Sequence, residues 1–395
     1  MISVKIAKEL VTKHSHLQSS IKIRLEDCIN HVLAEDIYAL RDIPGFHQSA
    51  MDGFALRIDD YNIKNKHTIK GESKAGIAYN STLGPGEASR IFTGAPVPVG
   101  ADTIVIQENI TIQNDQLIIN DKLLQKGSNV RPMGSEIKAN SLAFKKGSLL
   151  TPAAIGFLAA IGIYEVSVYS SPVIHLIVTG NELTKPGTKL LFGQVYESNS
   201  YTISAALQQM GLKLLSITQV KDDYEKIENT ILNKLNDSEI LLITGGISVG
   251  DYDYIAKALN ACGVEQVFHG IKQKPGKPLF FGCKGKKLIF GLPGNPSSVL
   301  TCFYEYVYPC IKAMMGYSQT NLPKKTLPLS NAYQKKSGLT HFVKAFCTAQ
   351  DVTPLHAQES YRMQSFAVSN CLICLGEEKE FFQNGDQVEV HLIPE

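Results

Sequence analysis

The stretch EILLITGG, residues 239–246, decides the class of the fold. Its apolar run is continuous and lacks the alternation of a half-exposed strand, so it is typical of a strand covered on both faces in a parallel sheet. Similar runs, VIHLIVTG at 173–180 and KKLIFGLPGN at 286–295, occur with helical patterns between them. Strands that alternate with helices predict a doubly wound, mostly parallel α/β domain, which we place at residues 172–318.

The segments outside this domain have other patterns, and the chain of 395 residues is long enough for four domains. Residues 44–139 contain short β-like runs between Gly and Pro clusters, which predict an inserted β-rich domain. Residues 1–43 with 140–171 predict a helical N-terminal linking domain, and residues 319–395 a small C-terminal β domain. The helices expected in the chain cover residues 4–13, 24–36, 152–162, 200–210, 223–236, 253–262 and 297–315.

The composition narrows the class of function. Lys and Arg total 39 against 37 Asp and Glu, a net charge of +2, which argues against a bulk nucleic-acid binder or a polybasic membrane protein. The longest uncharged run, 147–164, contains Pro and Gly and is too short to span a bilayer comfortably. The N-terminus has no apolar signal region, and eight Cys with a lone Cys371–Cys374 pair do not form a disulfide framework. We therefore expect a cytoplasmic protein.

Three strand ends in the α/β domain share glycines and hydroxyl residues. Ligands of open α/β sheets bind beyond the carboxyl ends of the strands, and glycines there let a ligand approach the backbone while helix starts favour an anion. For each loop alone, a plain turn between strand and helix is the alternative interpretation. The loop residues are Thr179 and Gly180, then Thr244, Gly245, Gly246, Ser248 and Gly250, then Pro293, Gly294, Asn295 and Pro296.

Acidic and basic side chains lie beside these loops. Asp251 and Asp253 could bind hydrated Mg²⁺ next to a phosphate, although either could simply cap the following helix. Three lysines at 272, 274 and 277, stiffened by two prolines, predict a positive patch for an oxyanion such as phosphate or molybdate, unless they form only a solvated turn. The loop at 244–253 matches neither the P-loop pattern nor the dinucleotide-binding fingerprint.

Together these blocks resemble the molybdopterin molybdenumtransferase (MoeA) family, which is related to the C-terminal domain of gephyrin. The blocks, which occur in order over most of the chain, are SAMDGFA, IFTGAPVPVGADTIVIQE, NVRPMGSE, TPAAIGFLAAIG, VTGNEL, TGGISVGDYDY, KPGKPLFFG and GLPGNPSSV. The resemblance implies an α/β domain of the molybdopterin-binding type and a homodimer whose active cleft joins two subunits. The implied reaction inserts molybdate into adenylylated molybdopterin, with Mg²⁺-dependent hydrolysis that releases AMP and gives molybdenum cofactor.

The resemblance also implies roles for individual residues. The catalytic residues would be Asp52, Glu182, Asp222, Asp251 and Asp253, and the ligands of Mg²⁺ would be Glu182, Asp251 and Asp253. The substrate-binding residues would be Thr93, Glu136, Thr179, Gly180, Ser198, Thr244, Gly245, Gly246, Ser248, Gly250, Lys274, Lys277, Pro293, Gly294, Asn295, Pro296 and Ser365. Two positions depart from the family pattern, because Glu136 stands where Asp is common and Lys344 where Arg is common.

Two other functions are left open. The chain could be an enzyme similar to molybdopterin adenylyltransferase, against which its β-rich segments argue, or a non-catalytic scaffold that binds molybdopterin. A molybdopterin adenylyltransferase and proteins that mature molybdoenzymes are the protein partners that the resemblance suggests.

Overall fold

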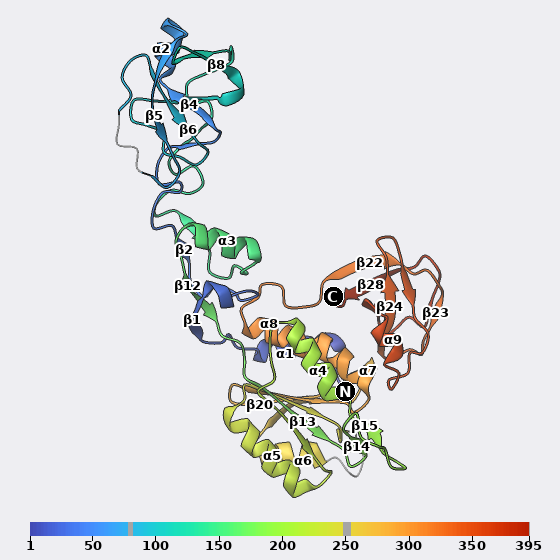
Figure 1. The fold of residues 1–395 in the computed structure, drawn as a ribbon. Helices are drawn as coiled ribbons and strands as arrows, with labels where there is room; N and C mark the ends of the chain where they lie inside the picture. The colour runs from blue at the N-terminus through green and yellow to red at the C-terminus, as the bar shows by residue number, and fades with distance from the viewer. Residues whose placement is uncertain (78–81, 248–253, 395) are drawn as a thin grey trace. The chain divides into compact units, whose positions relative to one another are not determined.

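A computed structural model describes residues 1–77, 82–247 and 254–394. The chain forms two compact units (Figure 1). The first contains Met1–Ala34, Leu149–Thr151 and Ser167–Glu395, and the second Glu35–Ser148 and Pro152–Val166. None of the helices in the described part of the chain has the length and hydropathy needed to cross a bilayer.

The first unit contains a six-stranded sheet in the order β16-β13-β17-β21-β20-β18. Its first four strands run parallel to one another, and β20 and β18 form an antiparallel edge. The predicted mostly parallel sheet is thus confirmed. The strands are β13 (Ile174–Thr179), β16 (Ser216–Val220), β17 (Ile240–Thr244), β18 (Glu265–His269), β20 (Phe280–Lys284) and β21 (Lys287–Leu292).

Alternate residues of the central strands face opposite layers of helices. Leu176 and Leu242 belong to a core shared with α4 (Asn199–Gln209) and α7 (Pro296–Cys302). Ile177, Leu241 and Ile243 belong to a second core, on the side of α5 (Tyr224–Asp237) and α6 (Tyr254–Ala261), which Figure 1 shows on the other face of the sheet. Burial on both faces explains why the strand sequences are apolar without alternation.

A long helical stretch covers the first of these faces. Helix α7 continues through a π-helical turn, η3 (Phe303–Val307), into α8 (Tyr308–Met314), and this confirms the helix predicted over 297–315. The N-terminal helix α1 (Val4–His14) begins after Ser3, whose hydroxyl oxygen accepts a hydrogen bond from the Ile6 N–H, and it packs into the same core with Ala7 and Val11.

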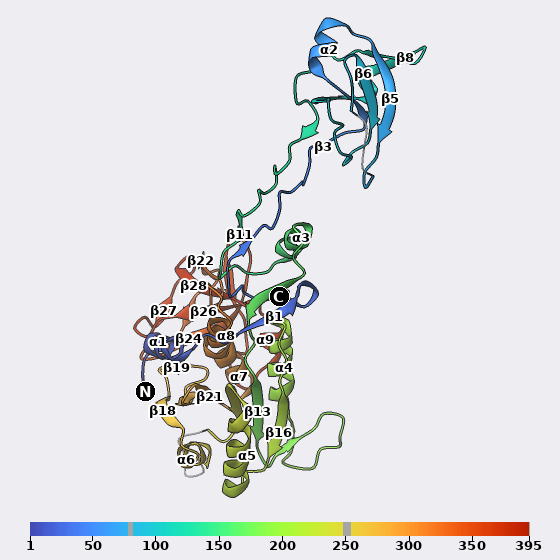
Figure 2. The same cartoon turned by 90° about the vertical axis from the view of Figure 1, so that its left-hand side faces the viewer.

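A second sheet of the first unit joins the C-terminal segment to the lysine-rich turn. Its order is β19-β24-β26-β28-β22, with β25 beside β24 (Figure 2). Because β19 pairs in parallel with β24, Lys274 lies opposite His341. The strands are β19 (Gln273–Lys274), β22 (Lys324–Pro328), β24 (Thr340–Cys347), β25 (Val352–Pro354), β26 (Cys371–Leu375) and β28 (Gln387–Leu392). Smaller elements here are β23 (Tyr333–Gln334), which pairs with β27 (Phe381–Phe382), and α9 (Gln364–Ala367).

The helix predicted over 24–36 is wrong. Only the short 3-10 helix η1 (Leu25–Asp27) forms, and Asn30 adopts a left-handed φ of 62°. Val32 and Leu33 instead form β-bridges with Leu149 and Val168, so partners distant in the sequence override the local helical spacing. The remaining paired strands of this unit or at its boundary are β1 (Ser20–Arg24) with β12 (Glu165–Tyr169) and β14 (Leu183–Thr184) with β15 (Val195–Tyr196).

The second unit is rich in β-structure, as predicted for its central part. A sheet of order β7-β4-β6-β5-β9-β8 encloses a core that includes Phe54, Val105 and Leu117. Its strands are β4 (Gly53–Leu56), β5 (His67–Ser73), β6 (Glu87–Ile91), β7 (Thr103–Ile106), β8 (Ile110–Gln113) and β9 (Gln116–Ile119). The other elements are β2 (Ile37–Tyr38), β3 (Gln48–Ser49), β10 (Val130–Arg131), β11 (Leu142–Phe144), η2 (Gln107–Asn109), α2 (Ile58–Ile63) and α3 (Pro152–Ala160), the last a predicted helix.

Candidate functional site

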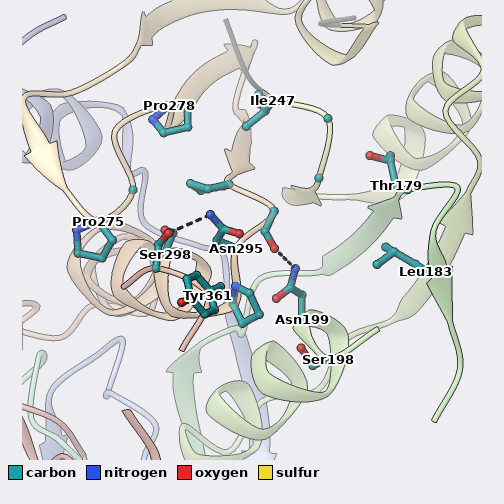
Figure 3. A pocket seen from close by; sticks show the side chains of 18 of the residues that line it. Thr179, Leu183, Ser198, Asn199, Ile247, Pro275, Pro278, Asn295, Ser298 and Tyr361 are labelled. Atoms are coloured by element: carbon teal, nitrogen blue, oxygen red, sulfur yellow. Dashed lines mark hydrogen bonds between the residues drawn. The ribbon is translucent and has the colours of Figure 1, made fainter. Parts of the chain in front are cut away.

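A pocket of about 860 Å³ lies at the carboxyl ends of β13, β17 and β21 in the first unit (Figure 3). The sheet order reverses here, because the chain places β16 on one side of β13 and then β17 on the other. Such a switch point is where open α/β sheets bind ligands. At Gly245, with φ of 92°, an added Cβ would lie 2.2 Å from the Thr179 carbonyl oxygen, so only glycine allows the two strand ends to approach this closely.

The pocket brings together residues that the sequence analysis drew from separate loops. The predicted residues that line it are Thr179, Gly180, Glu182, Ser198, Asp222, Gly245, Gly246, Lys274, Lys277, Pro293, Gly294, Asn295 and Pro296. Thr244, which directly precedes Gly245 in the chain, is the last residue of β17 and is completely buried. Ser248, Gly250, Asp251 and Asp253 lie outside the described residues.

One side of the pocket is acidic. Glu182 and Asp222 are both exposed to solvent. Two hydrogen bonds of 3.2 Å fix Asp222 to Asn181, one from the Asn181 N–H to Asp222 Oδ2 and one from the Asp222 N–H to Asn181 Oδ1. Both carboxylates are accessible and lie on loops tied to each other, and carboxylate oxygens are the type of ligand that Mg²⁺ prefers.

Asp223, next in the chain, has a structural role. Its carboxylate caps α5 by accepting a hydrogen bond of 3.1 Å from the Lys226 N–H. This backbone bond, helped by the Lys226 side chain, lowers the pKa of the Asp223 carboxyl group. Neighbouring aspartates are therefore divided between the pocket and the helix cap.

A second side of the pocket is basic. Lys274 and Lys277 line it, and among the described residues neither ammonium group has a hydrogen-bond or ion-pair partner. The turn that carries them is held tightly, because an added Cβ at Gly276 would lie 2.4 Å from Cys302 Sγ of α7. The third lysine of the predicted patch, Lys272, lies apart from the lining residues and pairs with Glu377 at 3.8 Å.

The basic side also affects a buried histidine. Burial, followed by the charges of Lys335 and Lys274, lowers the pKa of His341 to about 4. His341 is therefore neutral at pH 7 and adds no charge to the positive side of the pocket.

The third side of the pocket combines the predicted Gly294 and Asn295 with Asn199, Ser360 and Tyr361, which the sequence analysis did not identify. Asn295 Nδ2 donates to Ser360 Oγ at 2.9 Å, and Asn199 Nδ2 donates to the Gly294 carbonyl oxygen at 2.9 Å (Figure 3). Asn199 Oδ1 is buried and has no partner within the described residues. Tyr361 lies beside these groups. Ser360 and Tyr361 belong to the segment SYRMQSF, residues 360–366, in which the sequence analysis named only Ser365 as a candidate.

Family models match the chain in three consecutive stretches: the MoeA N-terminal region (domain I and II) at residues 2–162, a probable molybdopterin binding domain at 175–313, and the MoeA C-terminal region (domain IV) at 326–393. A molybdopterin molybdenumtransferase from Staphylococcus aureus (strain Mu50) is 32% identical over 400 residues, covering 99% of this chain and 95% of the relative. This chain belongs to the molybdopterin molybdenumtransferase family.

Other members of the molybdopterin molybdenumtransferase family agree with this assignment. A relative from Haemophilus influenzae is 30% identical over 374 residues, covering 93% of this chain and 92% of the relative. The solved structure of a molybdopterin biosynthesis MoeA protein from Pyrococcus horikoshii has a TM-score of 0.85 at 28% identity and covers 99% of each chain. The family resemblance and the multidomain fold predicted from the sequence are thus confirmed.

Of the remaining residues that the molybdopterin molybdenumtransferase resemblance singled out, Asp52, Thr93 and Glu136 belong to the second unit, and Ser365 of the first unit does not line this pocket. In the second unit, Asp52 Oδ1 accepts hydrogen bonds from the Thr93 N–H at 2.7 Å and from the Thr93 hydroxyl at 2.9 Å. These bonds, the backbone one first, lower the pKa of the Asp52 carboxyl group. Glu136 is exposed in the same unit. Ser365, in the first unit, is buried and its hydroxyl donates to the Ala357 carbonyl oxygen at 2.8 Å.

Proposed function

We propose that this chain inserts molybdate into adenylylated molybdopterin, with Mg²⁺-dependent hydrolysis that releases AMP and gives molybdenum cofactor. The observation that carries the proposal is the pairing, in one pocket, of accessible carboxylates with lysines that have no protein partner among the described residues. Such a pocket suits a substrate with a phosphoanhydride and an incoming oxyanion. The names of the curated relatives, molybdopterin molybdenumtransferase, support the same reaction.

Lys274 and Lys277 would hold the oxyanion. An ammonium group is a compact charge with three donors, and its hydrogen bonds to an oxyanion are charge-assisted. The pairing of β19 with β24 and the tight turn at Gly276 fix the backbone of Lys274 before a ligand arrives. The attraction is therefore positioned without further ordering of the turn.

Glu182 would bind Mg²⁺ together with Asp251 and Asp253, which lie outside the described residues. When bound, Mg²⁺ would offset the negative charge of the phosphoanhydride. Asp222, held by Asn181, would accept a proton from the attacking water. The oxygen of this water would bond to the phosphorus of the adenylyl group. The bond from that phosphorus to the bridging oxygen then breaks, and AMP leaves.

The loop residues would bind the rest of the substrate. The substrate-binding residues we propose are Thr179, Gly180, Ser198, Thr244, Gly245, Gly246, Ser248, Gly250, Pro293, Gly294, Asn295 and Pro296, with Thr93, Glu136 and Ser365 from other segments. At the strand ends, glycine lets the ligand approach backbone N–H groups directly. A volume of about 860 Å³ is adequate for a substrate of this size.

We also propose four domains, at 1–43 with 140–171, 44–139, 172–318 and 319–395. The three family models, of which one is described as domains I and II and another as domain IV, support this division. We further propose a cytoplasmic homodimer with its active cleft between subunits, in which Asp52 is catalytic. The fixed carboxylate of Asp52, oriented by Thr93, supports a role for this residue beyond folding.

The test incubates the purified chain with adenylylated molybdopterin, Mg²⁺ and molybdate, and measures AMP and active cofactor. We expect both products to depend on molybdate and Mg²⁺. Folded protein that releases no AMP above background would overturn the proposal. In that case, formation of adenylylated molybdopterin from ATP and molybdopterin would indicate an adenylyltransferase, and binding without turnover would indicate a scaffold.

A further inference from the structure

Lys344, in the middle of β24, is a lysine buried in the C-terminal sheet. It is 2% exposed, and its ammonium donates to the carbonyl oxygens of Ala357 at 2.8 Å, Arg362 at 2.9 Å and Glu359 at 3.4 Å. An ammonium group has three N–H donors and no acceptor. Three converging carbonyls therefore occupy all the donors of Lys344, and none is left for a ligand.

The backbone of Lys344 holds the same segment of chain. Its N–H donates to Gln358 Oε1 at 3.0 Å, and its carbonyl oxygen accepts from Gln358 Nε2 at 2.8 Å and from the Leu355 N–H at 2.9 Å. Ala357 has a left-handed φ of 59°, which is rare for a residue with a side chain. Residues 355–362 therefore adopt a tight conformation that is fixed largely by contacts with Lys344.

The other side of this segment reaches the pocket. Ser360 and Tyr361 line it. Ser360 accepts two hydrogen bonds at the start of α7, one at Oγ from Asn295 Nδ2 at 2.9 Å and one at its carbonyl oxygen from the Ser297 N–H at 3.0 Å. Figure 3 places Tyr361 beside Asn295 and Ser298. In the described part of the chain, Lys344 is not itself a lining residue.

We propose that Lys344 is a positioning residue, which fixes residues 355–362 so that Ser360 and Tyr361 form one wall of the pocket. The identity of the ligand that this wall binds rests on the proposed function, whereas the positioning role of Lys344 does not depend on it. The three carbonyls require only donors, and a guanidinium, which is common at this position in the family, also supplies donors and no acceptor. Lys344→Arg should therefore keep the segment in place, whereas Lys344→Met should release it.

The test compares Lys344→Met, which keeps the apolar stem and removes the ammonium, with Lys344→Arg and the wild type. Limited trypsin digestion reports the order of the segment, because Arg362 lies within it and its side chain is 49% exposed. We expect cleavage after Arg362 to be at least about tenfold faster in Lys344→Met and close to the wild-type rate in Lys344→Arg. The KM for adenylylated molybdopterin should rise about tenfold in Lys344→Met, with a smaller change in kcat.

Val390→Ala is the control for stability, because Val390 is fully buried in the core of the same sheet and lies in another strand. It should lower stability without faster cleavage after Arg362. If Lys344→Met does not fold, Gln358→Leu removes the side-chain bonds to the backbone of Lys344 and should give the same faster cleavage.

Two results would overturn the proposal. One is cleavage after Arg362 at the wild-type rate in both Lys344→Met and Gln358→Leu. The other is a loss of kcat in Lys344→Met with an unchanged KM, which is expected if the charge contacts the reacting groups. Faster cleavage in a protein whose wild type releases no AMP would leave the positioning role intact and reject only the proposed function.

Discussion

Lys274 and Lys344 stand on paired strands of one sheet, yet their environments are opposite. Lys274 is exposed, and its ammonium has no protein partner among the described residues, whereas Lys344 is 2% exposed and donates to three backbone carbonyls. Lys335 repeats the buried arrangement, since it is 6% exposed and donates to the carbonyl oxygens of Leu339 at 3.0 Å and Glu377 at 3.3 Å.

This difference shows that two lysines can have different roles, which depend on whether the ammonium group is buried or exposed. A charge removed from water must be satisfied by the protein and then stabilises a local conformation. A charge left in a solvated pocket remains available to a ligand. Only six of the 39 basic residues are Arg, so lysines carry most of both roles in this chain.

The largest effect on stability is expected from a buried carboxylate. Glu305, which is 2% exposed, accepts hydrogen bonds from Lys8 and from His391 Nδ1. Burial alone would raise the pKa of Glu305, but Lys8 and His391 outweigh it and lower the pKa to about 2. Glu305→Gln should therefore lower the free energy of unfolding by about 3 kcal/mol, because it removes the buried carboxylate that pairs with the Lys8 ammonium.

Denaturant unfolding at pH 7 measures this loss, and AMP release by the folded variant should stay near the wild-type rate. The matched control is Glu389→Gln at the exposed end of the same network, where Glu389 contacts His391 and Lys324 and its side chain is 46% exposed. It should cost less than about 1 kcal/mol. Equal losses in the two variants would show that burial does not separate the two carboxylates.

The next effect concerns pH. The pKa of His341 is lowered to about 4, so the unfolded chain, with an ordinary histidine pKa of about 6.5, binds more protons between these values. The free energy of unfolding therefore has its full value, as far as His341 is concerned, above about pH 6.5, and it decreases as the pH falls toward 4. Replacing His341 with Leu should reduce the loss of stability over this window by up to about 3 kcal/mol.

The pKa of His341 can also be followed directly by NMR. Lys274→Met should raise it, because the charge of Lys274 is one cause of the lowered value. Lys272→Met is the matched control, because the Lys272 ammonium pairs with Glu377. An unchanged pKa in Lys274→Met would mean that the basic side of the pocket does not act on this histidine.

Sequence reasoning identified those parts of the fold and of the pocket that depend on local pattern. The apolar run at 240–244 predicts the parallel sheet because both of its faces are buried, and glycines such as Gly245 mark the strand ends because the backbones approach there. Lys274 and Lys277 were predicted from the cluster of three lysines and two prolines at 272–278, and both line the pocket. Each of these signals needs only residues adjacent in the chain.

The features that sequence reasoning missed depend on contacts between distant segments. Val32 and Leu33 lie in a stretch with the apolar spacing of a helix, but they form β-bridges with Leu149 and Val168. Tyr361 lines the pocket on a loop that contacts Lys344 on one side and the start of α7 on the other. Nothing in the local sequence of either segment specifies those partners, so neither the non-helical segment nor the presence of Tyr361 at the pocket could be predicted.

Because Lys274 and Lys277 are exposed, unlike Lys344, we expect their replacement to lower activity without lowering stability. Lys274→Met and Lys277→Met should each lower the rate of AMP release about 100-fold, the typical cost of removing one charged donor from a transition state. Their unfolding midpoints should match that of the wild type, because both side chains are exposed. Lys272→Met should change the rate less than about twofold. Wild-type rates in Lys274→Met and Lys277→Met would remove these lysines from the reaction.

The smallest effects test the same division on two adjacent aspartates. Asp222→Asn should slow AMP release about tenfold through loss of a proton acceptor, with little change in stability because Asn keeps the bond from the Asn181 N–H. Asp223→Ala should instead cost about 1 kcal/mol by removing the cap of α5, with AMP release unchanged. Loss of activity in Asp223→Ala, or of stability in Asp222→Asn, would show that the acidic side of the pocket and the helix cap are not separate.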